Sequence, residues 1–162
     1  MAAHNPPAAF VPDDFTVPLE LVTQDFRLEP LGPQHNEGDY EAWTSSIDHI
    51  RATPGFPDGR WPRPDMTPDE NLADLRRHAA DFARRAGFTY TVVASGSDRI
   101  IGCVYIYPPG SADGDADVRS WVRADQTNLD AAVHDAVSAW LATAWPFTAV
   151  SYAPRTPPPP AE

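Results

Sequence analysis

The sequence predicts an α/β (α+β) domain in which a central β-sheet is covered by helices on both faces. The segment 100–107 is an apolar run without clean alternation, which is typical of a strand buried on both faces. Such a strand needs a layer of structure above it and another below it. Segments with helical periodicity at 35–52, 67–86 and 129–141 are expected to supply these layers.

Length and charge narrow the possible classes of protein. A chain of 162 residues fits one domain, which buries roughly 0.7 of its unfolded surface. Its net charge of −11, from 23 acidic and 12 basic residues, argues against nucleic acid as a partner, because phosphates require a basic face. The anionic surface serves solubility or steers a cationic substrate. No apolar run approaches the length of a membrane span, so we expect a cytoplasmic protein without a membrane partner.

The domain is expected to occupy residues 15–153. Residues 1–14 are rich in Pro and Ala and are predicted to be loose, and residues 154–162 are predicted to form a Pro-rich disordered tail. Cys103 is the single cysteine, so no intrachain disulfide can form. Because it lies in the most apolar strand, we expect it to be a buried structural thiol.

The N-terminal part is predicted to contain one or two strands within 16–31, with Phe26 and Leu28 facing inward. A helix is expected from His35 to Ala52. Its apolar stripe is formed by Tyr40, Trp43, Ile47 and Ile50. A Pro-rich loop follows at 54–66, and it is either a lining for a substrate or an ordinary surface loop.

The next helix has a well-marked beginning. Thr67 is expected to cap it, Pro68 to occupy its first position, and Glu70 to complete a capping box. Helical periodicity continues to Ala86, and Gly87 is expected to provide a left-handed stop.

The C-terminal half is predicted to begin with a hairpin. Strands at 88–95 and 99–107 are joined by the turn Ser95-Gly96-Ser97-Asp98. A third strand is expected at 116–122 and a final strand at 147–153, with the helix 129–141 between them.

This hairpin, TVVASGSDRIIGCVYIYP, resembles the corresponding hairpin of the GNAT (Gcn5-related N-acetyltransferase) superfamily, and the resemblance extends over 26–153. It implies a GNAT-like mixed, mostly antiparallel twisted sheet that is shortened at its C-terminus. It also implies that strand 116–122 splays from the next strand and binds the pantetheine arm of acetyl-CoA through its backbone. The turn that follows would hold the pyrophosphate at a helix N-terminus.

On this resemblance, the cofactor-binding residues are Val122, Arg123, Ala124, Asn128 and Leu129. The turn contains no glycine. Aligned on the helix stripe, its motif positions are occupied by Asp125, Asn128 and Asp130. Asn128 can cap the helix, but carboxylates at a helix N-terminus compete with a phosphate for the same donors.

Catalytic candidates are assigned by location. Acyl transfer to an amine needs a base, and Asp117 and Tyr105 lie on the two relevant strands. A solvated aspartate and a core tyrosine are the structural alternative. The residues expected to line a substrate site are Trp43, His49, Phe56 and Trp61. The five histidines are scattered without metal-ligand spacing, so no metal is expected.

The resemblance implies an N-acyltransferase that transfers an acetyl group from acetyl-CoA to a small amine. The alternative is a catalytically inactive GNAT-like binding or dimerisation module that no longer binds CoA. Family members carry a further helix after the last strand, often with a tyrosine as general acid, and a homodimer would replace these missing elements. A third possibility is non-acyl chemistry in the same cleft, where aromatic and acidic groups meet.

Overall fold

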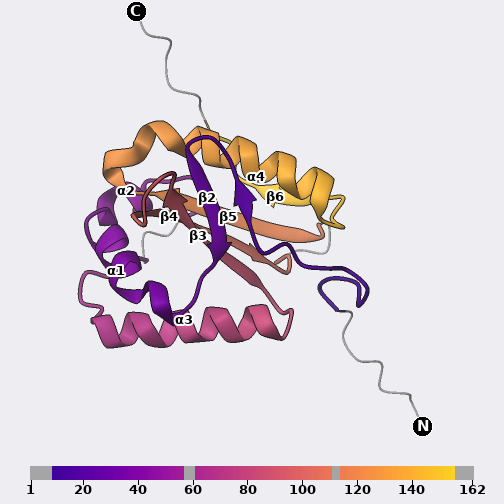
Figure 1. The fold of residues 1–162 in the computed structure, drawn as a ribbon, viewed down its shortest axis with the longest axis horizontal. Coiled ribbons are helices and arrows are strands. Elements are labelled where there is room, and N and C mark those ends of the chain that lie inside the picture. Colours follow the sequence, from indigo (N-terminus) through magenta and orange to yellow (C-terminus); the bar gives the residue numbers. More distant parts are fainter. Residues whose placement is uncertain (1–8, 57–60, 111–113, 156–162) are drawn as a thin grey trace, which may run out of the picture.

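The computed structural model describes residues 9–56, 61–110 and 114–155. Six strands form one sheet in the order β1-β2-β3-β4-β5-β6 (Figure 1). Their bounds are Leu21–Val22 (β1), Phe26–Pro30 (β2), Phe88–Ala94 (β3), Ile100–Tyr107 (β4), Ala116–Val122 (β5) and Val150–Tyr152 (β6). Neighbouring strands are antiparallel except β5 and β6, which are parallel. The predicted mixed, mostly antiparallel sheet is confirmed.

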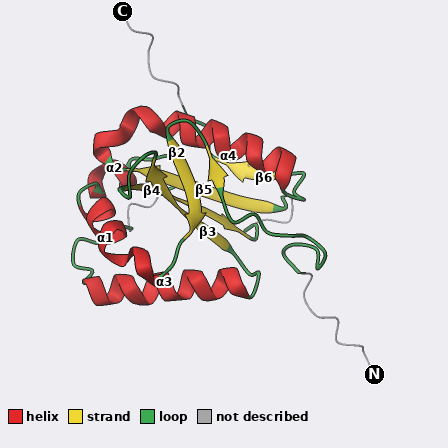
Figure 2. Ribbon diagram, viewed as in Figure 1, coloured by secondary structure: helices red, strands yellow, loops and turns green. Residues whose placement is uncertain are grey.

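Helices cover both faces of this sheet (Figure 2). Their bounds are Asn36–Thr44 (α1), Ile47–Arg51 (α2), Pro68–Ala83 (α3) and Asp130–Ala144 (α4), with short 3-10 helices at Pro33–His35 and Ala124–Leu129. Helices α1 and α3 lie on one side and α4 on the other (Figure 1). Within the ranges that the structure describes, no helix has both the length and the apolar character needed to cross a membrane.

Strand β4 lies between β3 and β5, and its side chains enter two separate cores. Val104 and Ile106 join the core beneath α4, whereas Cys103 joins the core beneath α1 and α3. Both cores are fully covered at these positions, which confirms a central strand buried on both faces. Cys103 is buried, as predicted.

The last two strands separate partway along their length. The pairing of β5 with β6 runs only from Ala116 to Val118 on β5, although β5 continues to Val122. Beyond Val118 the edge of β5 that faces β6 therefore has no strand partner among the described residues. The fold thus contains the splay that the resemblance implied.

The helix predicted from His35 to Ala52 is divided into α1 and α2. The break falls at Ser45 and Ser46, where polar side chains compete with the helical hydrogen bonds. Ser45 Oγ donates to the Ala42 carbonyl at 3.0 Å, and Ser46 Oγ accepts the N–H of Ala124 at 2.8 Å. This tie across the domain fixes the bend, which the apolar stripe did not reveal.

Helix α3 begins as predicted and ends differently. Thr67 Oγ1 accepts the N–H of Glu70, and the Glu70 side chain accepts the N–H of Thr67, both at 3.1 Å. At the other end, Arg85 takes the left-handed conformation, with φ of 62°. Gly87 is needed for space instead, because a Cβ there would lie 2.2 Å from the ring of Tyr107.

Parts of both terminal segments pack against the domain. Within 1–14, the described residues Phe10 and Val11 contact the core, and Val11 is 1% exposed. The Phe10 ring stacks on the Phe88 and Phe147 rings. Arg155, within the predicted tail, is also ordered against β5. Residues 1–8 and 156–162 of these predicted segments lie outside the described residues.

Gly102 lets β4 and β5 approach each other closely, so it offers a test of the sheet. A Cβ at this position would lie 2.4 Å from the Trp121 carbonyl oxygen, which belongs to the backbone of β5 and has no room to move away. We expect Gly102→Ala to lower the free energy of unfolding by about 2 kcal/mol in urea denaturation. Gly96→Ala, where nothing lies within 4 Å, should cost only the strain of its φ of 73°, about 1 kcal/mol. Equal costs would contradict this account of the sheet.

Candidate functional site

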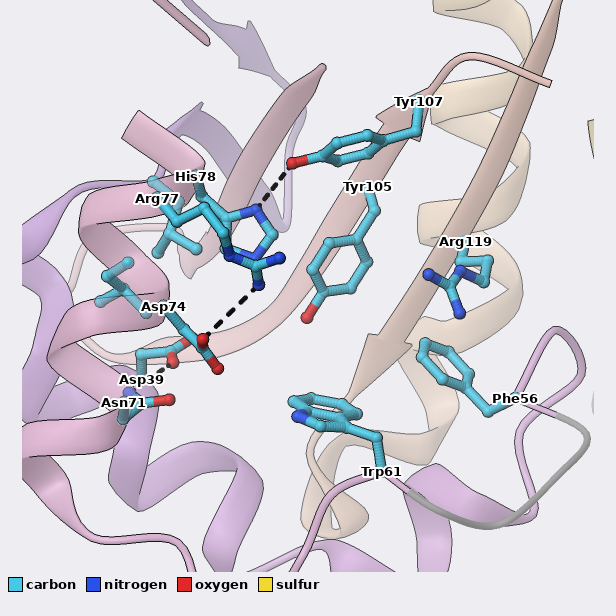
Figure 3. Close-up of a pocket in the computed structure, with 12 residues that line it drawn as sticks. Asp39, Phe56, Trp61, Asn71, Asp74, Arg77, His78, Tyr105, Tyr107 and Arg119 are labelled. Carbon is cyan, nitrogen blue, oxygen red and sulfur yellow. Dashed lines mark hydrogen bonds and ion pairs between the residues drawn. The ribbon is translucent and has the colours of Figure 1, made fainter. Parts of the chain in front are cut away.

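A pocket of about 290 Å³ lies on the α1 and α3 side of the sheet (Figure 3). Its walls come from α1, α3, the strands β4 and β5, and the loop that precedes α3. The lining residues are Leu31, Asp39, Phe56, Trp61, Asn71, Asp74, Leu75, Arg77, His78, Tyr105, Tyr107 and Arg119. This volume suits a small ligand, because it lies at the lower end of the range for small-molecule sites.

Asp39 forms the acidic wall of the pocket from α1. Its side chain is 4% exposed, and its Oδ2 accepts a hydrogen bond from Asn71 Nδ2 at 3.1 Å. Burial raises the pKa of Asp39 from 3.8 to about 6, the Asn71 hydrogen bond lowers it, and the charge of Asp74 raises it. Asn71 is itself held by Trp43, whose Nε1 donates to Asn71 Oδ1 at 3.0 Å. Asp39 is therefore a positioned carboxylate that a cation would stabilise.

Two further charged residues of α3 lie beside Asp39. Asp74 forms an ion pair with Arg77 at 3.5 Å, and both side chains are substantially exposed. The carboxylate of Asp74 thus lies at the edge of the pocket, where it adds negative potential next to the buried Asp39.

His78 closes the pocket where α3 meets β3 and β4. Its Nδ1 lies 2.9 Å from both the Tyr107 hydroxyl and Thr89 Oγ1. Burial lowers the pKa of His78 to about 4, and the charge of Arg77 lowers it further. The Tyr107 hydroxyl donates to Asp81 Oδ2 at 3.0 Å. At neutral pH this cluster holds a neutral imidazole.

The opposite wall is aromatic and cationic. The Arg119 guanidinium lies 5.4 Å from the ring centre of Phe56 and 6.0 Å from that of Tyr105. Trp61 stacks on Phe56 with ring centres 6.0 Å apart. Figure 3 shows Arg119 on the far side of the pocket from Asp39 and Asp74. The pocket therefore carries opposite charges on opposing walls, with aromatic faces between them.

Of the two predicted catalytic residues, the structure places only Tyr105 at this pocket. Its hydroxyl accepts a hydrogen bond from Trp121 Nε1 at 2.9 Å, and burial raises its pKa well above 10. Asp117 does not line the pocket. Its Oδ2 accepts the N–H of Gly110 at 2.9 Å and so holds the loop between β4 and β5. Both catalytic assignments stay predictions.

The four residues predicted to line a substrate site separate in the structure. Phe56 and Trp61 line the pocket. Trp43 is fully buried behind Trp61, with ring centres 6.0 Å apart, so it supports the wall. His49, on α2, is not among the lining residues, and its Nε2 is buried without a hydrogen-bond partner in the described structure.

The splay between β5 and β6 is filled by Arg155. This side chain is 3% exposed, and its Nε donates to Asp130 Oδ2 at 2.7 Å. Its two terminal nitrogens donate to the Ala153 carbonyl at 2.8 Å and to the Ser120 carbonyl at 2.7 Å. The Tyr152 hydroxyl lies 2.5 Å from Ser120 Oγ. The Ser120 carbonyl on the free edge of β5 is thus occupied by the protein itself.

The predicted cofactor-binding residues lie between β5 and α4. Val122 is buried in the core beneath α4, while Asn128 and Leu129 belong to the 3-10 helix Ala124–Leu129. The N–H of Arg123 donates to the Ile101 carbonyl at 2.8 Å, and that of Ala124 donates to Ser46. The donors of Arg123 and Ala124 are therefore used within the protein.

The carboxylates of this turn are paired with arginines. Asp125 accepts a hydrogen bond from Arg99 at 2.5 Å and one from Arg123 at 3.3 Å. The Arg99 hydrogen bond lowers the pKa of Asp125 below 3.8. Asp130, in the first turn of α4, is held by Arg155.

This arrangement does not fit the pantetheine and pyrophosphate of CoA. Arg155 takes the Ser120 carbonyl that the pantetheine arm would need, and every nitrogen of its guanidinium already donates. Asp130 places a carboxylate at the start of α4, where a pyrophosphate would approach. The residues present fill the site with their own contacts.

Among the described residues, no three His, Cys, Asp or Glu side chains gather in a way that could hold a metal ion.

The sequence contained a signal for the pocket residues that were missed. Asp39 precedes Trp43 by four residues, so a carboxylate lies beside the apolar stripe of α1. Asn71, Leu75 and His78 follow at steps of four and three, which puts two polar side chains on the inner face of α3. Arg119 shares a face of β5 with the buried Trp121, but nothing in the sequence indicated that its side chain lines a pocket.

We compared the sequence and the structure with those of known proteins. No protein-family model matches the sequence, and no curated protein matches it. Solved structures do match. The ribosomal-protein-S5-alanine acetyltransferase from Vibrio fischeri matches with a TM-score of 0.58 and 13% identity, over 76% of this chain and 67% of that chain.

Two further solved structures agree with the first. A putative GNAT-family acetyltransferase from Bordetella pertussis matches with a TM-score of 0.51 and 16% identity, over 76% of this chain and 72% of that chain. The ribosomal L7/L12 alpha-N-protein acetyltransferase RimL matches with a TM-score of 0.57 and 11% identity, over 75% of this chain and 63% of that chain. Together with the strand order and the splay of β5 from β6, these matches show that the chain has the GNAT acetyltransferase fold.

Proposed function

We propose that this protein binds a small amine-bearing molecule in the pocket between α1, α3, β4 and β5, and that it does so without CoA. The observation that carries the proposal is the filled splay. Arg155 and Asp130 form a buried ion pair at the place where the GNAT fold receives the cofactor. The pocket, by contrast, is open and lined by groups suited to a ligand.

The preference for an amine follows from the acidic wall. Burial makes ionisation of Asp39 unfavourable, so its pKa is raised to about 6. A ligand ammonium would offset that cost through a charge-assisted hydrogen bond. Trp61 lines the same space, and an indole ring also favours a cation.

Calorimetry with acetyl-CoA and, in parallel, with CoA tests the exclusion of the cofactor. We expect no heat of binding at millimolar ligand, because the β5 edge is occupied and the turn is acidic. A micromolar dissociation constant, about −8 kcal/mol, would contradict the proposal. The same titrations on Arg155→Ala show whether that side chain alone blocks the cleft, and we expect no binding there either, because Asp130 remains.

The second candidate is the N-acetyltransferase that the resemblance implied, acting on a small amine. It is supported by the position of the pocket, because Arg119 lines it and is also the first residue of β5 beyond the paired segment. An acceptor in the pocket would therefore lie next to the splay. This activity requires Arg155 to leave the cleft, so acetyl-CoA-dependent release of free thiol would favour it over the binding protein.

A further inference from the structure

We infer that the ligand of the pocket is a zwitterion of amino-acid type, with its ammonium at Asp39 and its carboxylate at Arg119. The inference rests on the proposed function, since it assigns the chemistry of the ligand at the same site. The inference goes beyond the proposed function because an amine alone gives Arg119 no group to bind.

The ammonium end is assigned to Asp39 because this carboxylate is buried and incompletely paired. Oδ2 accepts from Asn71, whereas the other oxygen has no hydrogen-bond partner among the described residues. Asp39 nevertheless lines the pocket, so its unpaired oxygen can be reached by a ligand. Asp74 strengthens the negative potential on this side but already has Arg77 as its own partner.

The carboxylate end is assigned to Arg119 because its guanidinium is held in place without being neutralised. Its contacts are the faces of Phe56 and Tyr105, and it has no ion-pair partner in the part of the chain that the structure describes. Stacking on aromatic faces leaves the edge of a guanidinium free to bind a carboxylate through two parallel hydrogen bonds. Arg77, the other pocket arginine, is paired with Asp74.

The space between the two ends is aromatic. Tyr105 and Trp61 lie between the acidic wall and Arg119, Phe56 lies beside Arg119, and the cavity of about 290 Å³ admits only a small molecule (Figure 3). An amino acid whose apolar chain separates the ammonium from the carboxylate combines these three properties. Its charged groups at opposite ends meet opposite charges, and the chain packs on aromatic faces.

The test uses calorimetry of the full chain with δ-aminovaleric acid and ε-aminocaproic acid, in which the apolar chain separates the two charges. Each is compared with its amide, which keeps the ammonium and lacks the carboxylate. We expect at least one amino acid to bind and its amide to bind at least tenfold more weakly. Arg119→Gln should weaken binding of the amino acid at least tenfold and change the affinity for the amide by less than twofold. Arg119→Lys should retain part of the preference for the amino acid over its amide. Arg76→Gln, an exposed arginine of α3 outside the pocket, is the matched control and should change neither affinity.

Two outcomes would overturn the inference. An amide that binds the wild type as well as its amino acid would remove the carboxylate assignment but leave a pocket for small amines. Failure of both amino acids to bind at millimolar concentration would remove the ligand class. Acetyl-CoA binding by the wild type would instead overturn the CoA-free function and leave the zwitterion site standing. Thermal denaturation shows whether Arg119→Gln still folds. We expect its melting temperature to equal that of the wild type, so that weaker binding reports the loss of a ligand contact.

Discussion

Replacing Asp39 with asparagine is expected to stabilise the protein while it abolishes ligand binding. Burial raises the pKa of Asp39 from 3.8 to about 6, so the folded state pays roughly 3 kcal/mol to keep this carboxylate ionised at pH 8. Asparagine keeps the shape and the acceptor for Asn71 without that cost. We expect the melting temperature to rise by roughly 5–10 °C at pH 8.

The pH dependence identifies the cause of this stabilisation. Because the pKa is raised in the folded state, the native protein binds more protons than the unfolded chain between about pH 4 and pH 6. The Asp39 contribution to stability therefore falls as the pH rises through that window. The gain from Asp39→Asn should be largest above pH 6 and should vanish near pH 4. The groups that face Asp39 are Asp74 from α3 and two residues of β4, Cys103 and Tyr105. Burial raises the pKa values of Cys103 and Tyr105.

Urea denaturation at pH 4, 6 and 8 measures this effect, and Asp65→Asn provides an exposed control. The control should change the free energy of unfolding by less than about 0.5 kcal/mol at each pH. If Asp39→Asn destabilised the protein at every pH, the ionised form of Asp39 would stabilise the fold, and it would not be a group held ready for a ligand. Weakened amine binding in a more stable variant is the combination that a functional carboxylate predicts.

The elements of the fold could be predicted because their residues repeat with the period of the structure they form. The apolar run at 100–107 marked the central strand, and Thr67 and Glu70 marked the start of α3. The break between α1 and α2 could not be predicted, since it depends on a hydrogen bond from Ala124 to Ser46, 78 residues apart. The end of α3 was also misplaced, because Gly87 is required by the Tyr107 ring and not by its backbone conformation.

The site was harder to predict than the fold because it depends on which side chains three-dimensional packing brings together. Phe56 and Trp61 were identified from an aromatic loop, and they do line the pocket. Asp39 and Arg119 come from α1 and β5, and no local motif joins them. The conflict between Asp130 and a pyrophosphate could be seen in the sequence, but the role of Arg155 could not, because its partners lie 25 and 35 residues away.

Removing Arg155 is expected to cost about 3–5 kcal/mol of unfolding free energy, a large share of the stability of a domain this size. Asp130 would lose its partner while its side chain stays only 19% exposed, and the Ser120 carbonyl would lose a hydrogen bond of 2.7 Å. Asp130 Oδ1 already lacks a partner in the described structure, which increases the penalty of leaving this carboxylate charged.

The comparison with a second ion pair makes this prediction specific. Arg99 and Asp125 approach to 2.5 Å, closer than Arg155 and Asp130, but their side chains are 40% and 55% exposed. Arg99→Ala should therefore cost less than about 1 kcal/mol, because water screens an exposed pair. In urea denaturation, the double variant Asp130→Asn/Arg155→Ala should recover part of the loss seen with Arg155→Ala, since no buried charge is then left unpaired. If Arg155→Ala cost no more than Arg99→Ala, the Arg155–Asp130 pair would not stabilise the fold as a buried pair, and Arg155 could leave the cleft at little cost.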